Sequence, residues 1–503
     1  MRSIITISLL LTSFLLLSQN IKEISQAYID ENGHQVLQDF KTLLSTPNVA
    51  SDLPNININA NYIKGELEKR GVDTQLLDME GVPPIVYGYL RGWHAERTIA
   101  FYVHYDGQPV DTTQWTQSPW TPTYYDKAIP DGGMVIDFPE KDDAIDPENR
   151  IYARSAGDDK APIIGILAAL DIIAESEIPI NTNFVFFFEG EEEAGSQHLG
   201  HYLKDNKELL DEIDIWLFCD GPSHQSRKPQ LVFGVRGVTG MELTVYGSNR
   251  PLHSGHYGNW APVPGQMLAN LLATMKDDEG TVIIDGYYDS VVPITDLEKN
   301  ALATVPPFDE ELKKELGLNR TEGKGTLNER ILLPTLTVRG LSSGNTGKLA
   351  RNVVPATATA SLGMRMVKGN DPKRMQDLVE AHVKKQGYHI VHEAPDQETR
   401  LKYPRIAKIT RGSGYPAART SMDNIIAQDI VKRTKLIAGE DLILLPTLGG
   451  SLPLYLFTDY LNKPAIIVSV ANHDNNQHAA DENLRIANLW YSVQLMTALL
   501  TIK

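Results

Sequence analysis

One stretch, Phe186–Ser196 (FFFEGEEEAGS), constrains the fold of this chain more than any other. The apolar run Val185–Phe188 leads directly into Glu189, and Glu191–Glu193 follow after one glycine. Consecutive apolar residues with polar flanks are typical of a buried β-strand. Carboxylates this close together repel one another unless cations lie among them. The stretch therefore indicates either a solvated acidic loop or a divalent-metal site in which one glutamate is a ligand and its neighbour a base.

Three further apolar runs end in acidic or histidine residues, and this recurrence favours the metal site. Thr98–Val103 leads into His104 and Asp106, Asp214–Cys219 into Asp220, and Ala465–Val470 into His473 and His478. In open α/β sheets, sites form outside the carboxyl ends of the strands. His104 and Asp106 are two residues apart, so in an extended chain both point to the same face. One of them can bind a metal while the other orients it.

Asp158 and Asp159 precede a predicted packed helix over Ala161–Ala174. An aspartate at a helix N-terminus caps free N–H groups and interacts favourably with the helix dipole, so capping alone is one explanation. The functional alternative is that Asp158 bridges two metal ions, Asp159 caps the helix and Lys160 offsets charge.

A chain of 503 residues is too long for one core, so we expect two domains. The pattern predicts an α/β fold, with a mostly parallel-sheet catalytic domain over 28–236 and 413–503. A smaller α/β lid or dimerisation domain is inserted over 237–412. The clearest helix in the insertion is Lys373–Gln386, with Asp371 as its cap, Pro372 at its first position and Gly387 at its end.

Met1–Gln19 has a positive start and a long apolar run, which predicts a signal peptide and a secreted or periplasmic protein. An uncleaved N-terminal anchor is the alternative. No second long apolar run follows, so we expect no other membrane association. Cys219 is the single cysteine, which excludes an internal disulfide and a cysteine metal cage. The net charge of −17 argues against nucleic-acid binding, which requires a basic face.

Eight motifs occur in an order that resembles the dinuclear-zinc metallopeptidases. They are HYDGQPVD, SAGDDKAP, EGEEEAGS, FCDGP, PLHSG, NVVP with MRMV, GGSLP and HAADEN. That family includes carboxypeptidases, acetylornithine deacetylase, aminoacylase and the carnosine-type dipeptidases, and the chain looks most similar to the last branch. The resemblance covers about Tyr28 to Ile502, essentially the whole chain after the N-terminal segment.

The resemblance implies a role for each matching residue. The implied metal ligands are His104, Asp158 as the bridge, Glu193, Asp220 and His478. Glu192 resembles the general base and Asp106 the partner of His104, while His253 resembles a histidine offered to the other subunit of a dimer. The implied contacts to the substrate carboxylate are Asn352, Arg365 and Ser451. His473 competes with His478, but the HxxxEN pattern fits only His478.

By this resemblance the protein is a hydrolase of dipeptides or small peptides, a homodimer with two Zn²⁺ per subunit. Mn²⁺ or Co²⁺ are alternatives, because His, Asp and Glu ligands suit all three ions. In the resembled family, Asp at the position of Asp220 is found in peptidases that act on free N-termini, whereas Glu is found in acylases and carboxypeptidases. Glu191 adds negative charge, which would favour a substrate with a cationic amine. An amidase or deacylase of N-acyl amino acids is the alternative enzyme. A binding protein without activity is the third interpretation, although every ligand type and the base are present.

Overall fold

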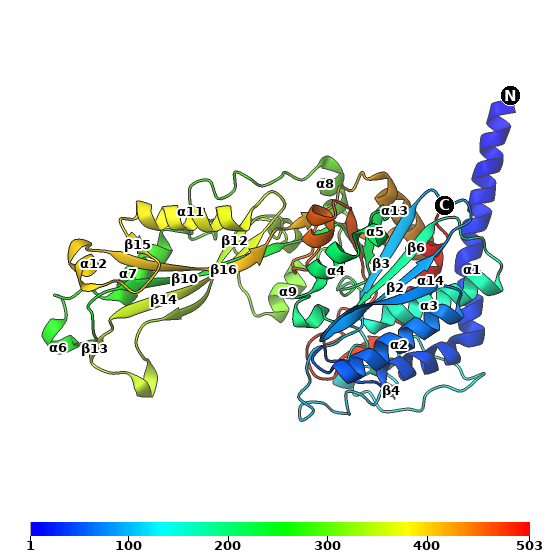
Figure 1. Ribbon diagram of the computed structural model, residues 1–503, viewed down its shortest axis with the longest axis horizontal. Coiled ribbons are helices and arrows are strands. Elements are labelled where there is room, and N and C mark those ends of the chain that lie inside the picture. The colour runs from blue at the N-terminus through cyan, green and yellow to red at the C-terminus, as the bar shows by residue number, and fades with distance from the viewer. Residues whose placement is uncertain (1) are drawn as a thin grey trace.

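The computed structural model describes the backbone of residues 2–503 and the side chains of residues 21–503. Its larger sheet has eight strands in the order β1-β2-β6-β3-β7-β19-β8-β18 (Figure 1). Their bounds are β1 Asp73–Met79, β2 Val82–Leu90, β3 Thr98–His104, β6 Asn183–Glu189, β7 Ile215–Phe218, β8 Gln230–Val232, β18 Ile443–Leu445 and β19 Ala465–Val468. The central strands β6, β3, β7 and β19 are parallel, so their carboxyl ends lie at one edge.

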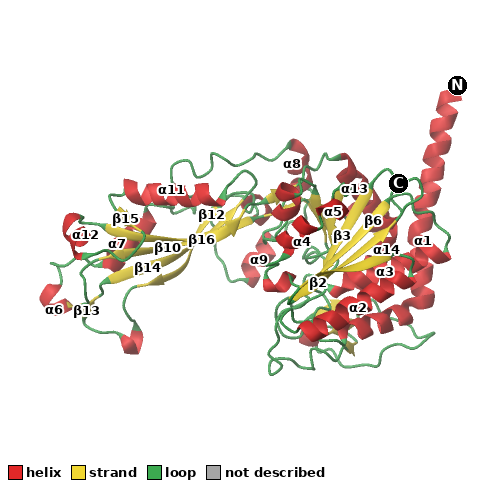
Figure 2. Cartoon of the chain, in the orientation of Figure 1, coloured by secondary structure: helices red, strands yellow, loops and turns green. Residues whose placement is uncertain are grey.

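Helices cover both faces of this sheet, because its central strands are apolar on both sides (Figure 2). Phe101 and Phe186 contribute to one core, and Tyr102 and Phe187, one residue further on, to the other. The first core contains α1 Arg2–Leu44, α2 Leu53–Lys69, α3 Lys160–Glu175, α13 Ile425–Ala438 and α14 Ile486–Leu500. The second contains α4 Leu199–Asp205, and α5 Lys207–Leu210 follows directly.

The inserted segment forms a second sheet of five strands in the order β12-β14-β10-β16-β15. These strands are β10 Gly237–Tyr246, β12 Thr335–Ser342, β14 Thr357–Met366, β15 His389–Val391 and β16 Ile406–Tyr415. Neighbours pair antiparallel except β15 with β16. The helices α7 Pro264–Ala273 and α11 Pro372–Lys385 pack against this sheet. The predicted cap of α11 is confirmed, since the Asp371 carboxylate accepts the backbone N–H of Arg374 at 2.8 Å.

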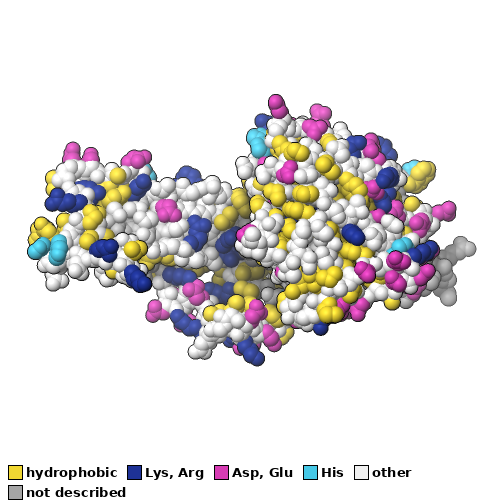
Figure 3. Space-filling view, turned by 90° about the horizontal axis from the view of Figure 1, so that it is seen from below, with side chains coloured by type: hydrophobic (Ala, Val, Ile, Leu, Met, Phe, Trp, Pro, Cys, Tyr) yellow, Lys and Arg dark blue, Asp and Glu magenta, His cyan; other side chains and the backbone are white. Residues whose placement is uncertain are grey.

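The two sheets lie in two lobes (Figure 1), and the inserted lobe is the narrower one (Figure 3). The predicted α/β class, with a mostly parallel catalytic sheet and a smaller inserted α/β unit, is confirmed. The exact division at 236 and 413 stays a prediction. β16 continues to Tyr415, and α8 Asp296–Ala303 of the inserted segment packs against β18 of the larger sheet. The remaining short helices are α6 Ser254–Tyr257, α9 Asp309–Glu315, α10 Leu327–Arg330 and α12 Gln397–Lys402.

Three small sheets complete the fold. One contains β4 Thr123–Tyr125, β5 Arg150–Tyr152 and β20 Asn483–Arg485, and it pairs the segment before Asp158 with the segment after His478. The others pair β9 Gly234–Val235 with β17 Ala418–Arg419, and β11 Leu252–His253 with β13 Val353–Val354. β11 and β13 lie at the end of the inserted lobe that is farthest from the larger sheet (Figure 1).

Candidate metal centre

The parallel strands bring the predicted ligands to one edge of the larger sheet. His104 is the last residue of β3 and is in register with Glu189, the last residue of β6. Asp220 follows β7, and Glu192 and Glu193 lie on a short 3₁₀ turn, Glu192–Ala194, beyond β6. The chain therefore carries its acidic residues past the carboxyl ends of buried strands, where α/β folds form sites.

Five of these side chains form two groups that share one carboxylate. The donor atoms of His104, Asp158 and Asp220 lie within 4.8 Å of one another, and so do those of Asp158, Glu193 and His478. His104 Nε2 is 3.0 Å from Asp158 Oδ1. His478 Nε2 is 3.2 Å from both Asp158 Oδ2 and Glu193 Oε2. The two oxygens of Asp158 thus face different groups, as a bridging carboxylate requires.

The charges in this cluster fit cations that the protein itself does not supply. Burial raises the pKa of Asp220 to about 6, and the nearby carboxylate of Asp158 adds to the rise. Burial also raises the pKa of Glu192 well above its ordinary value, and Asp220 and Glu193 add to the shift. Hydrogen bonds to Asp158 and Glu193 raise the pKa of His478 to about 10. Imidazole and carboxylate donors of this kind suit Zn²⁺, Mn²⁺ or Co²⁺, so the residues present fit a pair of such ions.

Asp106 is fully buried and connects His104 to the two glutamates. Its Oδ1 lies 3.4 Å from His104 Nδ1 and accepts the N–H of Glu192 at 3.1 Å. Its Oδ2 accepts the N–H of Glu193 at 3.0 Å. The side chain therefore orients an imidazole and a turn of backbone at once.

Three neighbouring residues differ from the expectations. Asp159 occupies the N-cap position of α3 but makes no capping hydrogen bond, because its carboxylate lies 3.4 Å from the backbone N–H of His104. Lys160 points away from the cluster and donates to Leu43 O at 2.9 Å, so it does not neutralise the cluster by contact. Glu191 lies 2.9 Å from His198 Nδ1, so its carboxylate already has a hydrogen-bond partner within the chain.

The predicted substrate contacts separate into two places. Arg365 Nη1 donates to Ser451 Oγ, which joins the inserted sheet to the glycine-rich loop Gly449–Pro453 of the first domain. Asn352 instead lies beside His253 at the far end of the inserted lobe, where its backbone carbonyl accepts the N–H of Ser254 at 3.0 Å. Because β11 and β13 lie at the far end of the inserted lobe (Figure 1), neither His253 in β11 nor Asn352 directly before β13 reaches the acidic cluster of its own chain.

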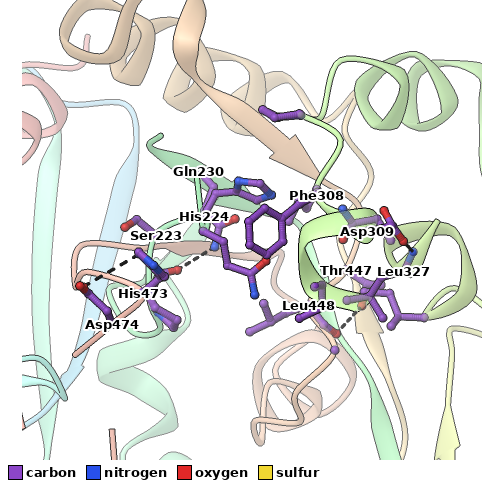
Figure 4. Close-up of a pocket in the computed structure, with 18 of the residues that line it drawn as sticks. Ser223, His224, Gln230, Phe308, Asp309, Leu327, Thr447, Leu448, His473 and Asp474 are labelled. Carbon is purple, nitrogen blue, oxygen red and sulfur yellow. Dashed lines mark hydrogen bonds and ion pairs between the residues drawn. The ribbon is translucent and has the colours of Figure 1, made fainter. Parts of the chain in front are cut away.

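A cavity of about 600 Å³ lies between the loop after Asp220 and the helices α9 and α10 (Figure 4). His473 lines this cavity together with Asp474, Phe308 and Leu448. Its Nδ1 is 4.0 Å from Asp474, whereas His478 contacts the shared carboxylate. Of the two competing histidines, the structure therefore brings His478 to the cluster.

Several residues of the site were not predicted from the sequence. Gln108 Nε2 donates to Glu193 Oε2 at 2.8 Å, and Gln477 Nε2 donates to Asp158 Oδ2 at 2.8 Å. Arg236 is buried and its N–H donates to Gly450 O at 3.1 Å, beside Ser451. Burial and the nearby Arg365 lower the pKa of Arg236 to about 10. Two guanidinium groups that lie near each other favour the binding of an anion.

Comparisons with known proteins agree with this geometry. The profile of peptidase family M20/M25/M40 matches residues 100–502. The chain is 25% identical over 485 residues to the Cys-Gly metallodipeptidase dug1 of Schizosaccharomyces pombe, covering 93% of this chain and 95% of that protein. It is 22% identical over 425 residues to the human Beta-Ala-His dipeptidase, covering 83% of this chain and 77% of that protein. The solved structure of the M20 family metallo-carboxypeptidase Sso-CP2 from Sulfolobus solfataricus is 27% identical, with a TM-score of 0.71 over 93% of this chain and 98% of that one.

The comparisons correct one prediction. The prediction of a secreted or periplasmic protein is wrong, because the match to yeast Cys-Gly metallodipeptidases extends over nearly the whole chain. The prediction rested on residues 1–19, whose side chains lie outside the described part of the structure, and α1 continues through residue 19 without a break to Leu44. Within the described part of the chain, no helix combines the length and apolar character that a membrane crossing requires.

Proposed function

The chain belongs to peptidase family M20/M25/M40, and from this premise we propose that it hydrolyses unblocked dipeptides at a dinuclear metal centre. In this proposal the ligands are His104, Asp158, Glu193, Asp220 and His478, with Asp158 shared between two ions. The observation that carries the proposal is that the donor atoms form two compact groups with one residue in common.

Two Zn²⁺ ions, or Mn²⁺ or Co²⁺, would supply a Lewis acid and a water of lowered pKa when bound. Glu192 then accepts the proton of the attacking water and delivers it to the leaving amine. Its carboxylate lies in the same turn as Glu193, so the proton acceptor is held beside the ligands. Asp106 keeps this turn in place through its two backbone hydrogen bonds.

The carboxylate end of the substrate would be bound by Arg365 and Ser451, which already contact each other. A guanidinium binds a carboxylate with two parallel hydrogen bonds, so this pair fixes the end of a short peptide. Arg236, behind the same loop, adds positive charge. At the amine end, Asp220 is one methylene shorter than glutamate and leaves more room. Glu191 gives no support there, since it pairs with His198.

We further propose a homodimer in which His253 works in the site of the other subunit, with residues 237–412 as the inserted domain. His253 is exposed at the tip of the inserted lobe, and its Nδ1 accepts the N–H of Gly255 at 3.1 Å. A histidine there is free to contact a second copy. Asn352 lies beside it, so any contact of Asn352 with substrate would also be made across the dimer.

The test is product analysis by mass spectrometry on a pool of free dipeptides, their N-acetylated forms and simple N-acetyl amino acids. We expect the purified, metal-loaded protein to cleave the free dipeptides. N-acetylation should lower kcat/KM by at least ~10-fold, about 1.4 kcal/mol of transition-state stabilisation. If N-acetyl amino acids are the better substrates, the protein is a deacylase. If nothing in the pool is cleaved, the proposed activity is wrong.

A further inference from the structure

Glu482 is a buried carboxylate at which two segments of the chain meet. Its side chain is 0% exposed, and it lies four residues after His478 in the same loop. Each of its two carboxylate oxygens accepts two hydrogen bonds from the segment that carries Asp158. Oε1 accepts the N–H groups of Gly157 at 3.0 Å and Asp158 at 2.9 Å. Oε2 accepts Arg154 Nη1 at 2.7 Å and the N–H of Ser155 at 3.0 Å.

These hydrogen bonds fix a segment that has little regular structure of its own. Ser155 has a φ of 64°, in the left-handed region that a residue other than glycine adopts only when its surroundings hold it there. Residues 153–159 lie between β5 and α3, so no sheet or helix bonds order them. Hydrogen bonds to an ionised acceptor are stronger than neutral ones. Glu482 therefore supplies much of what gives this turn a single conformation.

The same residue links the loops of two predicted ligands. The backbone N–H of Asp158 donates to Glu482, and the Asp158 side chain contacts His478, which lies on the same loop as Glu482. β20 pairs with β5 immediately beside this contact and keeps the two loops in register. A shift of Glu482 would therefore move the shared carboxylate relative to His478.

We propose that Glu482 is a positioning residue, which holds the backbone of residues 154–158 so that the two oxygens of Asp158 face two metal ions. This rests on the proposed function. Glu482 itself contacts neither substrate nor metal in this account. It acts through Asp158, as hydrogen-bonded residues behind metal ligands do, and loss of such a residue weakens metal binding or activity by ~10–100-fold.

The test variant is Glu482→Gln, which keeps the shape of the side chain. Each carboxylate oxygen accepts two N–H donors, so the amide –NH₂ must face two donors wherever it turns. The matched control is Asp481→Asn, the neighbouring carboxylate. Asp481 accepts from the N–H and the hydroxyl of Thr116, and an asparagine satisfies both because a hydroxyl can also accept.

Metal affinity is measured by titrating the metal-free proteins with Co²⁺ and recording its visible spectrum, with circular dichroism to check that each variant is folded. For Glu482→Gln we expect the affinity for at least one ion to fall ~10–100-fold, with a changed Co²⁺ spectrum. We also expect kcat to fall while KM changes little, because the carboxylate end of the substrate is held elsewhere. Asp481→Asn should behave as the original protein. A role limited to folding would lower the melting temperature alone and leave the spectrum unchanged.

A folded Glu482→Gln that binds both ions with unchanged affinity and spectrum overturns the proposal. If this variant is recovered unfolded, Arg154→Met decides, since it removes the buried bond to Oε2 and, apart from that, only the contact of the guanidinium with the ring of Trp115. That variant should show a smaller loss of affinity, and unchanged metal binding in it would equally contradict the role. If the original protein binds no metal at all, the proposed function itself is wrong, and the role of Glu482 is refuted with it.

Discussion

The carboxylate of Asp106 accepts the backbone N–H groups of both Glu192 and Glu193, at 3.1 and 3.0 Å. A single side chain thus fixes the turn that presents the proposed base and the proposed ligand, while the same carboxylate faces His104 Nδ1 at 3.4 Å. The spacing of His104 and Asp106 suggested only the second of these contacts. The contact of Asp106 with the two N–H groups explains how two adjacent glutamates can take different roles, because it fixes the backbone of both residues while their side chains point in different directions.

For Asp106→Asn we expect a fall in kcat of ~10–100-fold with a smaller change in KM, because the amide cannot accept from both N–H groups. Steady-state kinetics on a free dipeptide measure this. The control is Asp111→Asn, whose carboxylate is exposed and bonds only to Thr113 and Gln114 nearby. Equal activity of both variants would show that the turn is ordered without Asp106.

Removal of metal should abolish activity and lower the melting temperature. Without cations, the carboxylates of Asp158, Glu193 and Asp220 lie close together and repel one another. An ion that binds only the folded state at 1,000 times its Kd stabilises it by about 4 kcal/mol. Calorimetric scans before and after dialysis against a chelator, and after return of Zn²⁺, Mn²⁺ or Co²⁺, measure both effects. Full activity in the chelated, metal-free protein would refute the metal-dependent mechanism.

Arg365→Met should raise KM for a free dipeptide by ~10–100-fold, because a charged hydrogen-bonded pair is lost. The corresponding dipeptide amide has no carboxylate and should be affected little. The comparison of the two substrates therefore isolates the charge from any change in folding. Arg405→Met is the control, since this arginine contacts Gln386 O and the ring of Tyr388 in the inserted lobe. Equal losses on both substrates would place the carboxylate contact elsewhere.

Mixing inactive His253→Ala with inactive Glu192→Gln subunits should restore part of the activity. A dimer with two-fold symmetry has two equivalent sites. In a mixed dimer, one of them contains both original residues, so up to about half of the sites in mixed dimers should regain activity. Subunit exchange is followed by native mass spectrometry. Exchange without recovered turnover would contradict the proposed role of His253 across the interface.

The central sheet was predictable because its strands are apolar on both faces and end in polar residues. The runs before His104, Glu189 and Asp220 correspond to β3, β6 and β7. The antiparallel pairing of the inserted sheet was not predictable, since the strand and helix order alone resembled a parallel unit. The almost entirely buried helix α14 was missed, because apolar residues all around a helix leave no amphipathic period.

The ligand types of the site were predictable from the sequence, but the hydrogen bonds that support them were not. The HxxxEN pattern selected His478 over His473, and the structure brings His478 to Asp158. No pattern showed that Glu482 lies against residues 154–158, because that contact joins positions more than 300 residues apart. The pairing of Glu191 with His198 likewise depends on where α4 begins.

The most direct test of the whole account is the metal content and turnover of Glu192→Gln and Glu193→Gln, measured on the same samples. We expect Glu192→Gln to retain two ions per subunit while kcat falls by several orders of magnitude, because a base acts only in the chemical step. Glu193→Gln should instead lose metal, since its carboxylate lies 3.2 Å from the other ligand His478. Loss of metal from Glu192→Gln, or normal turnover in it, would contradict the assignment of base and ligand on which the proposed mechanism depends.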